Sequence, residues 1–286
     1  MLDIKTNTEC RDIIAPLFDK QQYTENYVSV SDVKTLVCDK FDSDKVAGEL
    51  EEKNFNNPDS KYYQMTKEQI LESWEGKAKT SMNYGRLLDS AAEQLLEVRD
   101  EAEWEMFLLD NNYECDEKFS ATVDALRSFL KDCAKKGIEY VGREIPIVYN
   151  VDGVGCVKGR IDCLLYNKEK DKFIIIDWKT DDSIDTMPNR WTKPCLGPAS
   201  NILQLNSQTY TLQVYSYKAA LLQTVLKGKD PNKIQCFICN CPKYKTDGAA
   251  KYTLYPAQFD YNEEQLSKIY SFCIKKKIIL NKKKQQ

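Results

Sequence analysis

The sequence of 286 residues contains no histidine. Histidine serves as the general base in many catalytic triads and dyads and is the commonest metal ligand among the side chains. Its absence therefore excludes every triad, dyad and zinc site that depends on an imidazole.

Long apolar runs and a strong net charge are also missing. No segment approaches the roughly 18 apolar residues of a membrane-spanning helix, and Met1–Thr6 lack the hydrophobic region of a signal peptide. We therefore expect a protein without membrane contact that remains in the cytoplasm. The formal net charge of −3 excludes a basic field over the whole molecule, so any contact with nucleic acid must use local basic patches.

The spacing of apolar residues predicts helices in the first half of the chain. Ser31 is a candidate N-cap of a short helix, and Thr66–Gln69 has the pattern of a capping box that opens a longer one. Two further helices are expected over 83–97 and 121–135 because apolar residues recur there at steps of three and four.

Beyond Gly137 the apolar spacing becomes that of strands. We expect strands over 141–149, 157–165, 173–179 and 233–241, and helices over 209–227 and 263–279. The connection over 181–209 is long for a compact domain and is a candidate substrate-contacting flap. The order predicts one mixed α/β core over residues 83–286, preceded by a helical annex over 1–82.

The residues with the clearest chemistry end the apolar run of the strand over 173–179. Asp177 and Lys179 follow four apolar residues and, two positions apart, share one face of the strand. Asp162 interrupts the expected neighbouring strand, where a buried carboxylate is costly without a cation. The two aspartates could share Mg²⁺ or Mn²⁺, which prefer oxygen ligands, with the lysine beside them. Such a site is suited to phosphodiester hydrolysis.

Several motifs resemble the PD-(D/E)XK nuclease superfamily, and in particular its RecB-like exonuclease branch. Gly159-Arg160-Ile161-Asp162 followed by Asp177-Trp178-Lys179 resembles the catalytic strands. Three further segments resemble motifs of this branch: Gly85-x-x-x-Asp89-x-x-x-Glu93 resembles its GxxxHxxxE helix, Arg143-Glu144 the start of its first core strand, and Gln213 with Tyr217 its QxxxY helix. Tyr27–Ser31 and Thr66–Trp74 resemble segments of phage and viral relatives of the mitochondrial genome maintenance exonuclease. The resemblance implies a restriction-endonuclease-like core, a mixed sheet flanked by helices.

The resemblance also implies roles for the residues of these motifs. Asp162 and Asp177 would bind the metal together with the Trp178 carbonyl, Glu93 and Asp89. Lys179 would be the catalytic cation. Three residues would bind substrate: Gln213, Tyr217 and Arg160. Glu144 would contact the metal ligands without binding the metal itself. Asp89 stands where the branch has histidine. This aspartate could ligate a hard ion, could be a solvated helix residue, or could mark a weakened enzyme.

Three functional interpretations remain open at this point. The favoured one is a metal-dependent DNA exonuclease that acts on single strands or ends in replication, recombination or repair. The alternatives are a structure-specific endonuclease with the same site and a catalytically weakened DNA-binding protein; no protein partner is predicted.

The cysteines raise a separate question, because some nucleases of the branch hold an iron–sulfur cluster with one upstream and three downstream cysteines. Cys10 and the group Cys236, Cys239 and Cys241 have that order but depart from the usual spacing. We therefore favour reduced, buried thiols over a cluster for these residues.

Overall fold

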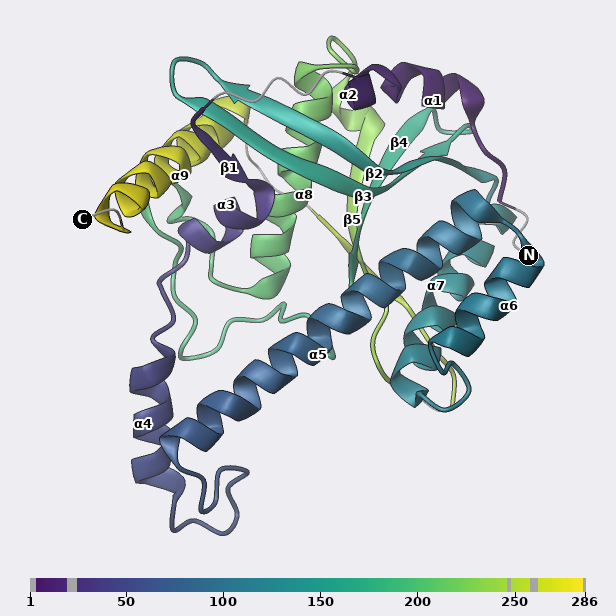
Figure 1. Ribbon diagram of the computed structural model, residues 1–286. Helices are drawn as coiled ribbons and strands as arrows, with labels where there is room; N and C mark the ends of the chain where they lie inside the picture. Colours follow the sequence, from purple (N-terminus) through teal and green to yellow (C-terminus); the bar gives the residue numbers. More distant parts are fainter. Residues whose placement is uncertain (1–3, 20–24, 246–247, 258–261, 285–286) are drawn as a thin grey trace. The chain divides into compact units, whose positions relative to one another are not determined.

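The computed structural model describes residues 4–19, 25–245, 248–257 and 262–284 (Figure 1). Contacts divide the chain into two compact units, one of Met1–Asp39 with Leu88–Gln286 and one of Lys40–Leu87. We call these the sheet unit and the helical unit. The domain boundary expected between residues 82 and 83 stays a prediction.

A six-stranded mixed sheet organises the sheet unit. Its strands are β1 (Tyr27–Ser29), β2 (Ile138–Val151), β3 (Gly155–Asn167), β4 (Lys172–Lys179), β5 (Ile234–Asn240) and β6 (Thr253–Pro256). β3 pairs antiparallel with β2 and β4 and parallel with β1, whereas β5 runs parallel to β4 and antiparallel to β6. The expected class, a mixed α/β sheet flanked by helices, is confirmed.

The four expected strands correspond to β2, β3, β4 and β5, each within a few residues of its expected bounds. The apolar run Phe173–Ile176 lies at the centre of the sheet and is buried throughout, as a strand covered on both faces requires. β1 and β6 were not expected. Each has only three or four residues, too few to show a repeating pattern.

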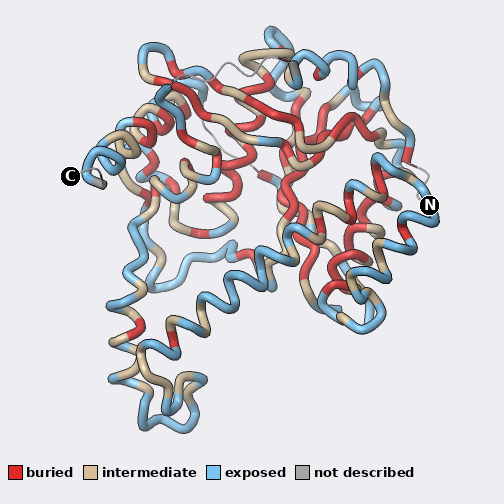
Figure 2. Tube along the Cα trace, viewed as in Figure 1, coloured by how far each residue is buried: buried red, intermediate tan, exposed pale blue. Residues whose placement is uncertain are grey.

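Helices α7 (Glu117–Lys135) and α8 (Asn206–Gln223) cover opposite faces of the sheet. Successive side chains of a strand point to opposite faces, and on β4 Asp177 bonds to α8 while Trp178 packs edge-on against Phe129 of α7. The other helices of this unit are α1 (Thr8–Ile14), α2 (Pro16–Asp19), α3 (Val30–Leu36), α6 (Glu101–Asp110) and α9 (Glu263–Lys284). In Figure 2 the strands of this unit are largely buried.

The short helix α3 begins two residues earlier than expected. Its N-cap is Ser29, whose hydroxyl accepts the Asp32 N–H at 2.9 Å while the Asp32 carboxylate accepts the Ser29 N–H at 2.9 Å. The expectation that Ser31 caps this helix is therefore wrong. Two reciprocal hydrogen bonds outweigh the single bond that a cap at Ser31 would offer.

The helical unit contains α4 (Ser43–Asn54) and the first part of α5 (Lys67–Glu93). The expected capping box at its start is present, since the Thr66 N–H donates to Gln69 Oε1 at 2.8 Å. The two helices expected around 66–74 and 83–97 are one continuous helix, α5, which ends in the π-helical turn η1 (Gln94–Val98). None of the helices in the described ranges combines the length and apolar character needed to cross a membrane.

Candidate active site

The end of β4 brings a carboxylate and an ammonium together on the face that α8 covers. Asp177 is fully buried and its carboxylate accepts a hydrogen bond from the Lys179 ammonium. The same ammonium donates to the backbone carbonyl of Trp178 at 3.1 Å. The alternation of β4 therefore places Asp177 and Lys179 on one side of the strand.

Side chains of helix α8 hold the Asp177 carboxylate in position. The Gln213 amide donates to Asp177 Oδ1 at 2.9 Å and to the Tyr217 hydroxyl at 2.9 Å. Gln213 is 9% exposed and Tyr217 is 3% exposed. Burial, followed by the nearby Asp177 and Asp162, raises the pKa of Tyr217, so its hydroxyl stays neutral. This geometry supports action through Asp177; direct contact with substrate, as the sequence suggested, stays a prediction for both residues.

Asp162 lies on β3, the strand next to β4. Its Oδ2 accepts the backbone N–H of Trp178 at 2.8 Å, so the two expected strands are neighbours and their acids lie at the same place in the sheet. Burial raises the pKa of Asp162, and the negative charge of Asp177 raises it further. Burial lowers the pKa of Lys179, but the negative charges of Asp177 and Asp162 outweigh burial, so the pKa is raised.

The donor atoms of this cluster fit a hard divalent cation. Asp162 and Asp177 supply carboxylate oxygens and Trp178 a carbonyl oxygen, the ligand type that Mg²⁺ and Mn²⁺ prefer. One ammonium leaves the paired carboxylates with excess negative charge, which a cation would offset. Within the described ranges no three acidic or cysteine side chains gather as a metal site. Water or substrate oxygens would complete the coordination, as is common for Mg²⁺.

Comparison with known proteins identifies the family. Residues 60–278 match the PD-(D/E)XK nuclease superfamily, and this range is more than half of the chain. The chain belongs to the PD-(D/E)XK nuclease superfamily. A search of curated proteins gave no match. The crystal structure of SSO0001 aligns over 94% of this chain and 85% of that one at 15% identity, with a TM-score of 0.35, which is too low to carry an argument.

Membership in a PD-(D/E)XK family makes the chain a nuclease, and nucleases of this superfamily typically use divalent metals. Nucleic acid is accordingly the class of substrate. The family match includes β3, β4 and α8, which position the cluster of acids and lysine.

The helix of the expected GxxxHxxxE motif holds its acids in a separate ion-pair cluster. Arg143 of β2 lies 2.8 Å from Asp89, 3.3 Å from Glu93 and 3.9 Å from Glu97. The guanidinium side chain is only 8% exposed. Steps of four put these acids on one helical face, and the structure gives them a common arginine partner. Metal binding by Asp89 and Glu93 stays a prediction, and Glu97 was not among the residues that the motifs singled out.

Glu144 and Arg160 lie beside the acids of the PD-(D/E)XK core. They form a mutual ion pair at 3.3 Å, with Arg160 69% and Glu144 34% exposed at the side chain. Glu144 has φ +48°, a strained backbone for a residue with a side chain, and its charge adds to the raised pKa of Asp162. A supporting role for Glu144 and substrate binding by Arg160 remain predictions.

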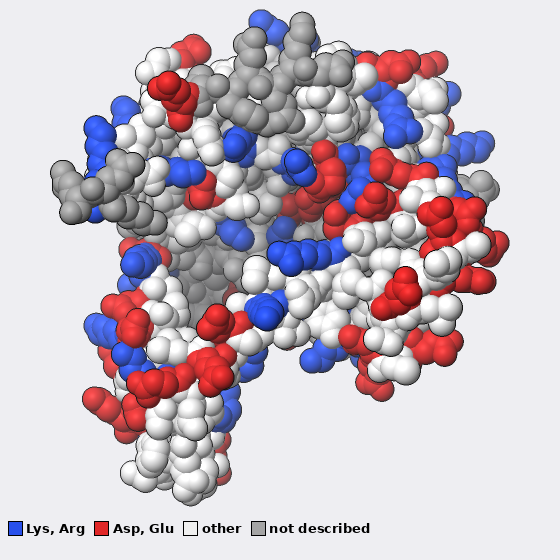
Figure 3. Space-filling view, viewed as in Figure 1, with Lys and Arg blue, Asp and Glu red and all other residues white. Residues whose placement is uncertain are grey.

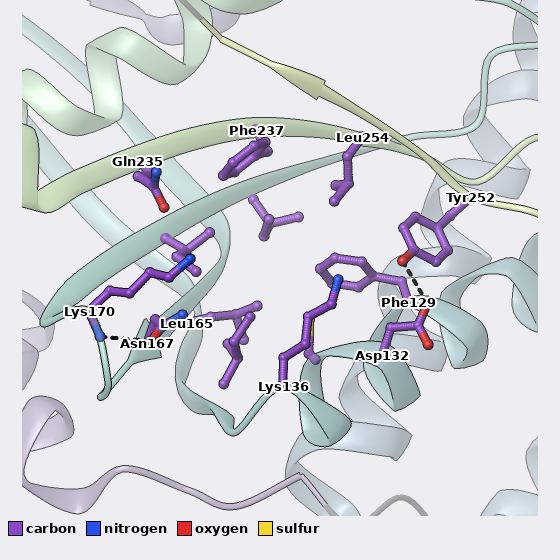
Figure 4. Close-up of a pocket in the computed structure, with 14 residues that line it drawn as sticks. Phe129, Asp132, Lys136, Leu165, Asn167, Lys170, Gln235, Phe237, Tyr252 and Leu254 are labelled. Carbon is purple, nitrogen blue, oxygen red and sulfur yellow. Dashed lines mark hydrogen bonds between the residues drawn. The ribbon is translucent and has the colours of Figure 1, made fainter.

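Trp178 points away from the catalytic face, as its position between Asp177 and Lys179 requires. Its ring is 7% exposed and meets Phe129 with centroids 5.5 Å apart. A pocket of about 200 Å³ opens on this same side, between α7 and the sheet (Figure 4). It is lined by Ile174 and Ile176, which alternate with Asp177, so this pocket lies on the opposite face from the acids.

Three residues near Lys179 were missed by sequence reasoning. The Lys179 ammonium lies 4.8 Å from the ring centroid of Tyr210, whose hydroxyl donates to Asp181 at 2.9 Å. Lys34 of α3 approaches the same ring, 4.5 Å from its centroid. Asp181 could have been found, because it continues the alternation of Asp177 and Lys179. Tyr210 and Lys34 carry no such signal.

The cysteines considered as cluster ligands all lie in regular structure or directly after it. Cys10 is on α1, Cys236 and Cys239 are on β5, and Cys241 follows β5; all four are buried. Burial raises the pKa of Cys10 to about 11 and of Cys236 to about 12, which keeps these thiols protonated. The preference for reduced thiols stays a prediction.

Proposed function

We propose that this nuclease is a Mg²⁺- or Mn²⁺-dependent DNA exonuclease of the RecB-like branch, acting on single strands or ends in replication, recombination or repair. The observation that carries the proposal is the convergence of Asp162, Asp177 and Lys179 on one face, with Gln213 bonded to Asp177. The QxxxY pattern on α8 is the feature that favours this branch.

The chemistry is hydrolysis of a phosphodiester: a water oxygen bonds to phosphorus, the P–O bond to the leaving strand breaks, and that oxygen gains a proton. A bound metal ion would polarise the phosphate and lower the pKa of a coordinated water. Asp162 and Asp177 would hold it, with the Trp178 carbonyl beside them. Gln213 keeps the Asp177 carboxylate oriented through its 2.9 Å bond.

Lys179 acts as a cation rather than as a base in this scheme. Burial lowers the pKa of Lys179, but the nearby aspartates outweigh burial and raise it, which favours the protonated ammonium over a neutral amine that could accept a proton from water. Its positive charge is suited to neutralising the charge that develops on the phosphate oxygens. The connection over 181–209 starts two residues after this lysine, and its exposed Trp191 supports the idea of a substrate-contacting flap.

A second candidate is a catalytically weakened DNA-binding protein with the same fold. The observation in its favour is the pairing of Asp89 and Glu93 with Arg143, which occupies two acids that the resemblance assigned to the metal. The complete set of Asp162, Asp177 and Lys179 argues against it.

The test is degradation of linear and circular DNA, single- and double-stranded, with Mg²⁺, Mn²⁺ or EDTA. The variant Lys179→Ala is compared with Lys268→Ala, which removes an exposed lysine of α9 that pairs with Glu264. Loss of linear DNA alone, abolished by EDTA and by Lys179→Ala, supports the exonuclease. Cutting of circles indicates an endonuclease, and DNA binding without lysine-dependent cleavage indicates the weakened protein.

A further inference from the structure

Lys34 is a half-buried lysine close to the catalytic cluster that the chemistry above does not use. It is the fifth residue of α3, and the capping box of Ser29 and Asp32 fixes the start of that helix. The neighbouring Val33 is fully buried in the core, so α3 cannot rotate without exposing apolar surface. The side of α3 from which Lys34 projects is therefore set by the fold.

The Lys34 ammonium has an aromatic partner but no carboxylate partner in the described part of the chain. It lies 4.5 Å from the ring centroid of Tyr210, within the range of a cation–π contact. No ion pair or hydrogen bond joins it to an acid in those ranges. Other half-buried lysines nearby are paired, such as Lys277 with Asp32 at 2.6 Å. Asp177 and Asp181 lie close enough to favour its charged form, but neither is bonded to it, so the ammonium is left able to bind an anion of a ligand directly.

Tyr210 joins this lysine to the catalytic one. The Lys179 ammonium lies 4.8 Å from the same ring centroid, so the two ammonium groups are no further apart than the sum of these two distances. Two like charges at this separation repel one another: burial lowers the pKa of Lys34 and the charge of Lys179 lowers it further, while Asp177 and Asp181 offset only part of this effect. An anion placed between or beside them would relieve this repulsion.

The anion that a nucleic acid substrate would present near Lys34 and Lys179 is a backbone phosphate. The face seen in Figure 3 has basic side chains scattered among acidic ones, without a broad basic surface. On this face, contacts to the DNA backbone would come from a few individual cations. We infer that Lys34 binds a backbone phosphate of the substrate next to the scissile one, with Tyr210 holding its ammonium beside Lys179. This inference rests on the proposed function.

The test measures binding apart from cleavage. Affinity for a labelled single-stranded oligonucleotide is measured by fluorescence anisotropy in EDTA over a range of salt concentrations. Each phosphate contact to a single strand contributes about 0.7 to the slope of log K against log salt. We expect Lys34→Met and Lys34→Gln to reduce affinity several-fold and to make the slope shallower by about 0.7, whereas Lys34→Arg keeps the slope.

Lys268→Met serves as the matched control, because it removes an exposed lysine whose partner is Glu264. Thermal unfolding of each variant reports folding, and Lys34→Gln and Lys34→Met provide two neutral replacements of different polarity. If the wild-type chain cleaves DNA and both variants keep its affinity and slope, the role of Lys34 is overturned while the proposed function stands.

The remaining outcomes are also decisive. A wild-type chain that binds DNA without cleaving it overturns the proposed exonuclease, yet a shallower slope for Lys34→Met would still support the phosphate contact. A wild-type chain that binds neither single- nor double-stranded DNA overturns both. A variant with lower affinity but an unchanged slope assigns Lys34 to positioning Tyr210 and overturns the inference.

Discussion

The Gln213→Leu substitution separates the role that the structure supports for this residue from direct substrate binding. Leucine is an apolar side chain one carbon shorter than glutamine, and it cannot donate the bonds to Asp177 and Tyr217, both 2.9 Å long. Asp177 would then keep only Lys179 among the partners described above. We expect the carboxylate to lose its fixed orientation.

The size of the effect follows from burial. Leaving a buried hydrogen-bonding group without its partner costs about 1–3 kcal/mol, and Asp177 and Tyr217 both lose a donor. Replacing residues that orient a metal-binding carboxylate typically reduces activity by about 10–100-fold. We therefore expect kcat to fall by about that factor, the KM for DNA to stay within about twofold, and more Mg²⁺ to be needed for half-maximal rate.

The assay is steady-state cleavage of a single-stranded oligonucleotide, with DNA and Mg²⁺ varied separately. Gln223→Leu is the matched control, because Gln223 is on the same helix and its amide bonds to the backbone of Asn150, at 2.6 and 2.9 Å. A rise in KM with an unchanged kcat for Gln213→Leu would show that this side chain contacts DNA and would refute the positioning role.

Two further predictions concern the framework of the site. Gly159→Ala should lower the free energy of unfolding by about 1–3 kcal/mol, because a Cβ there would lie 2.7 Å from Val30 Cγ2 and 3.2 Å from Tyr217. Thermal unfolding checks this against Gly76→Ala, where the added carbon meets nothing within 4 Å; equal stability of the two variants would contradict it. Arg143→Met should lower the free energy of unfolding by only about 0.2–1 kcal/mol, because the acids that lose their cation, Asp89 and Glu93, are 40% and 49% exposed and regain water. Stability raised by this change at low salt would show that the arginine is not their stabilising partner.

The sequence alone determined the features that depend on neighbours along the chain. The apolar run before Asp177 and the two-residue step to Lys179 specify a buried strand with both groups on one face, because strand alternation is local. The capping box at Thr66 and the four-residue step from Gln213 to Tyr217 are equally local, and both were found. The sequence did not reveal three short features, since short segments carry little periodic signal: β1, α6 and the N-cap of α3 at Ser29.

Only the tertiary structure decided which distant side chains meet. Gln213 bonds to Asp177 across 36 residues, and Arg143 reaches Asp89 across 54. Lys34 meets Tyr210 because α3 packs on α8 beside the sheet. Such contacts depend on how helices are packed against a sheet, which the burial of apolar faces sets collectively and which no single segment encodes. The sequence therefore predicts the atoms that can do the chemistry, and the packing of α3, α5 and α8 decides which of them act together.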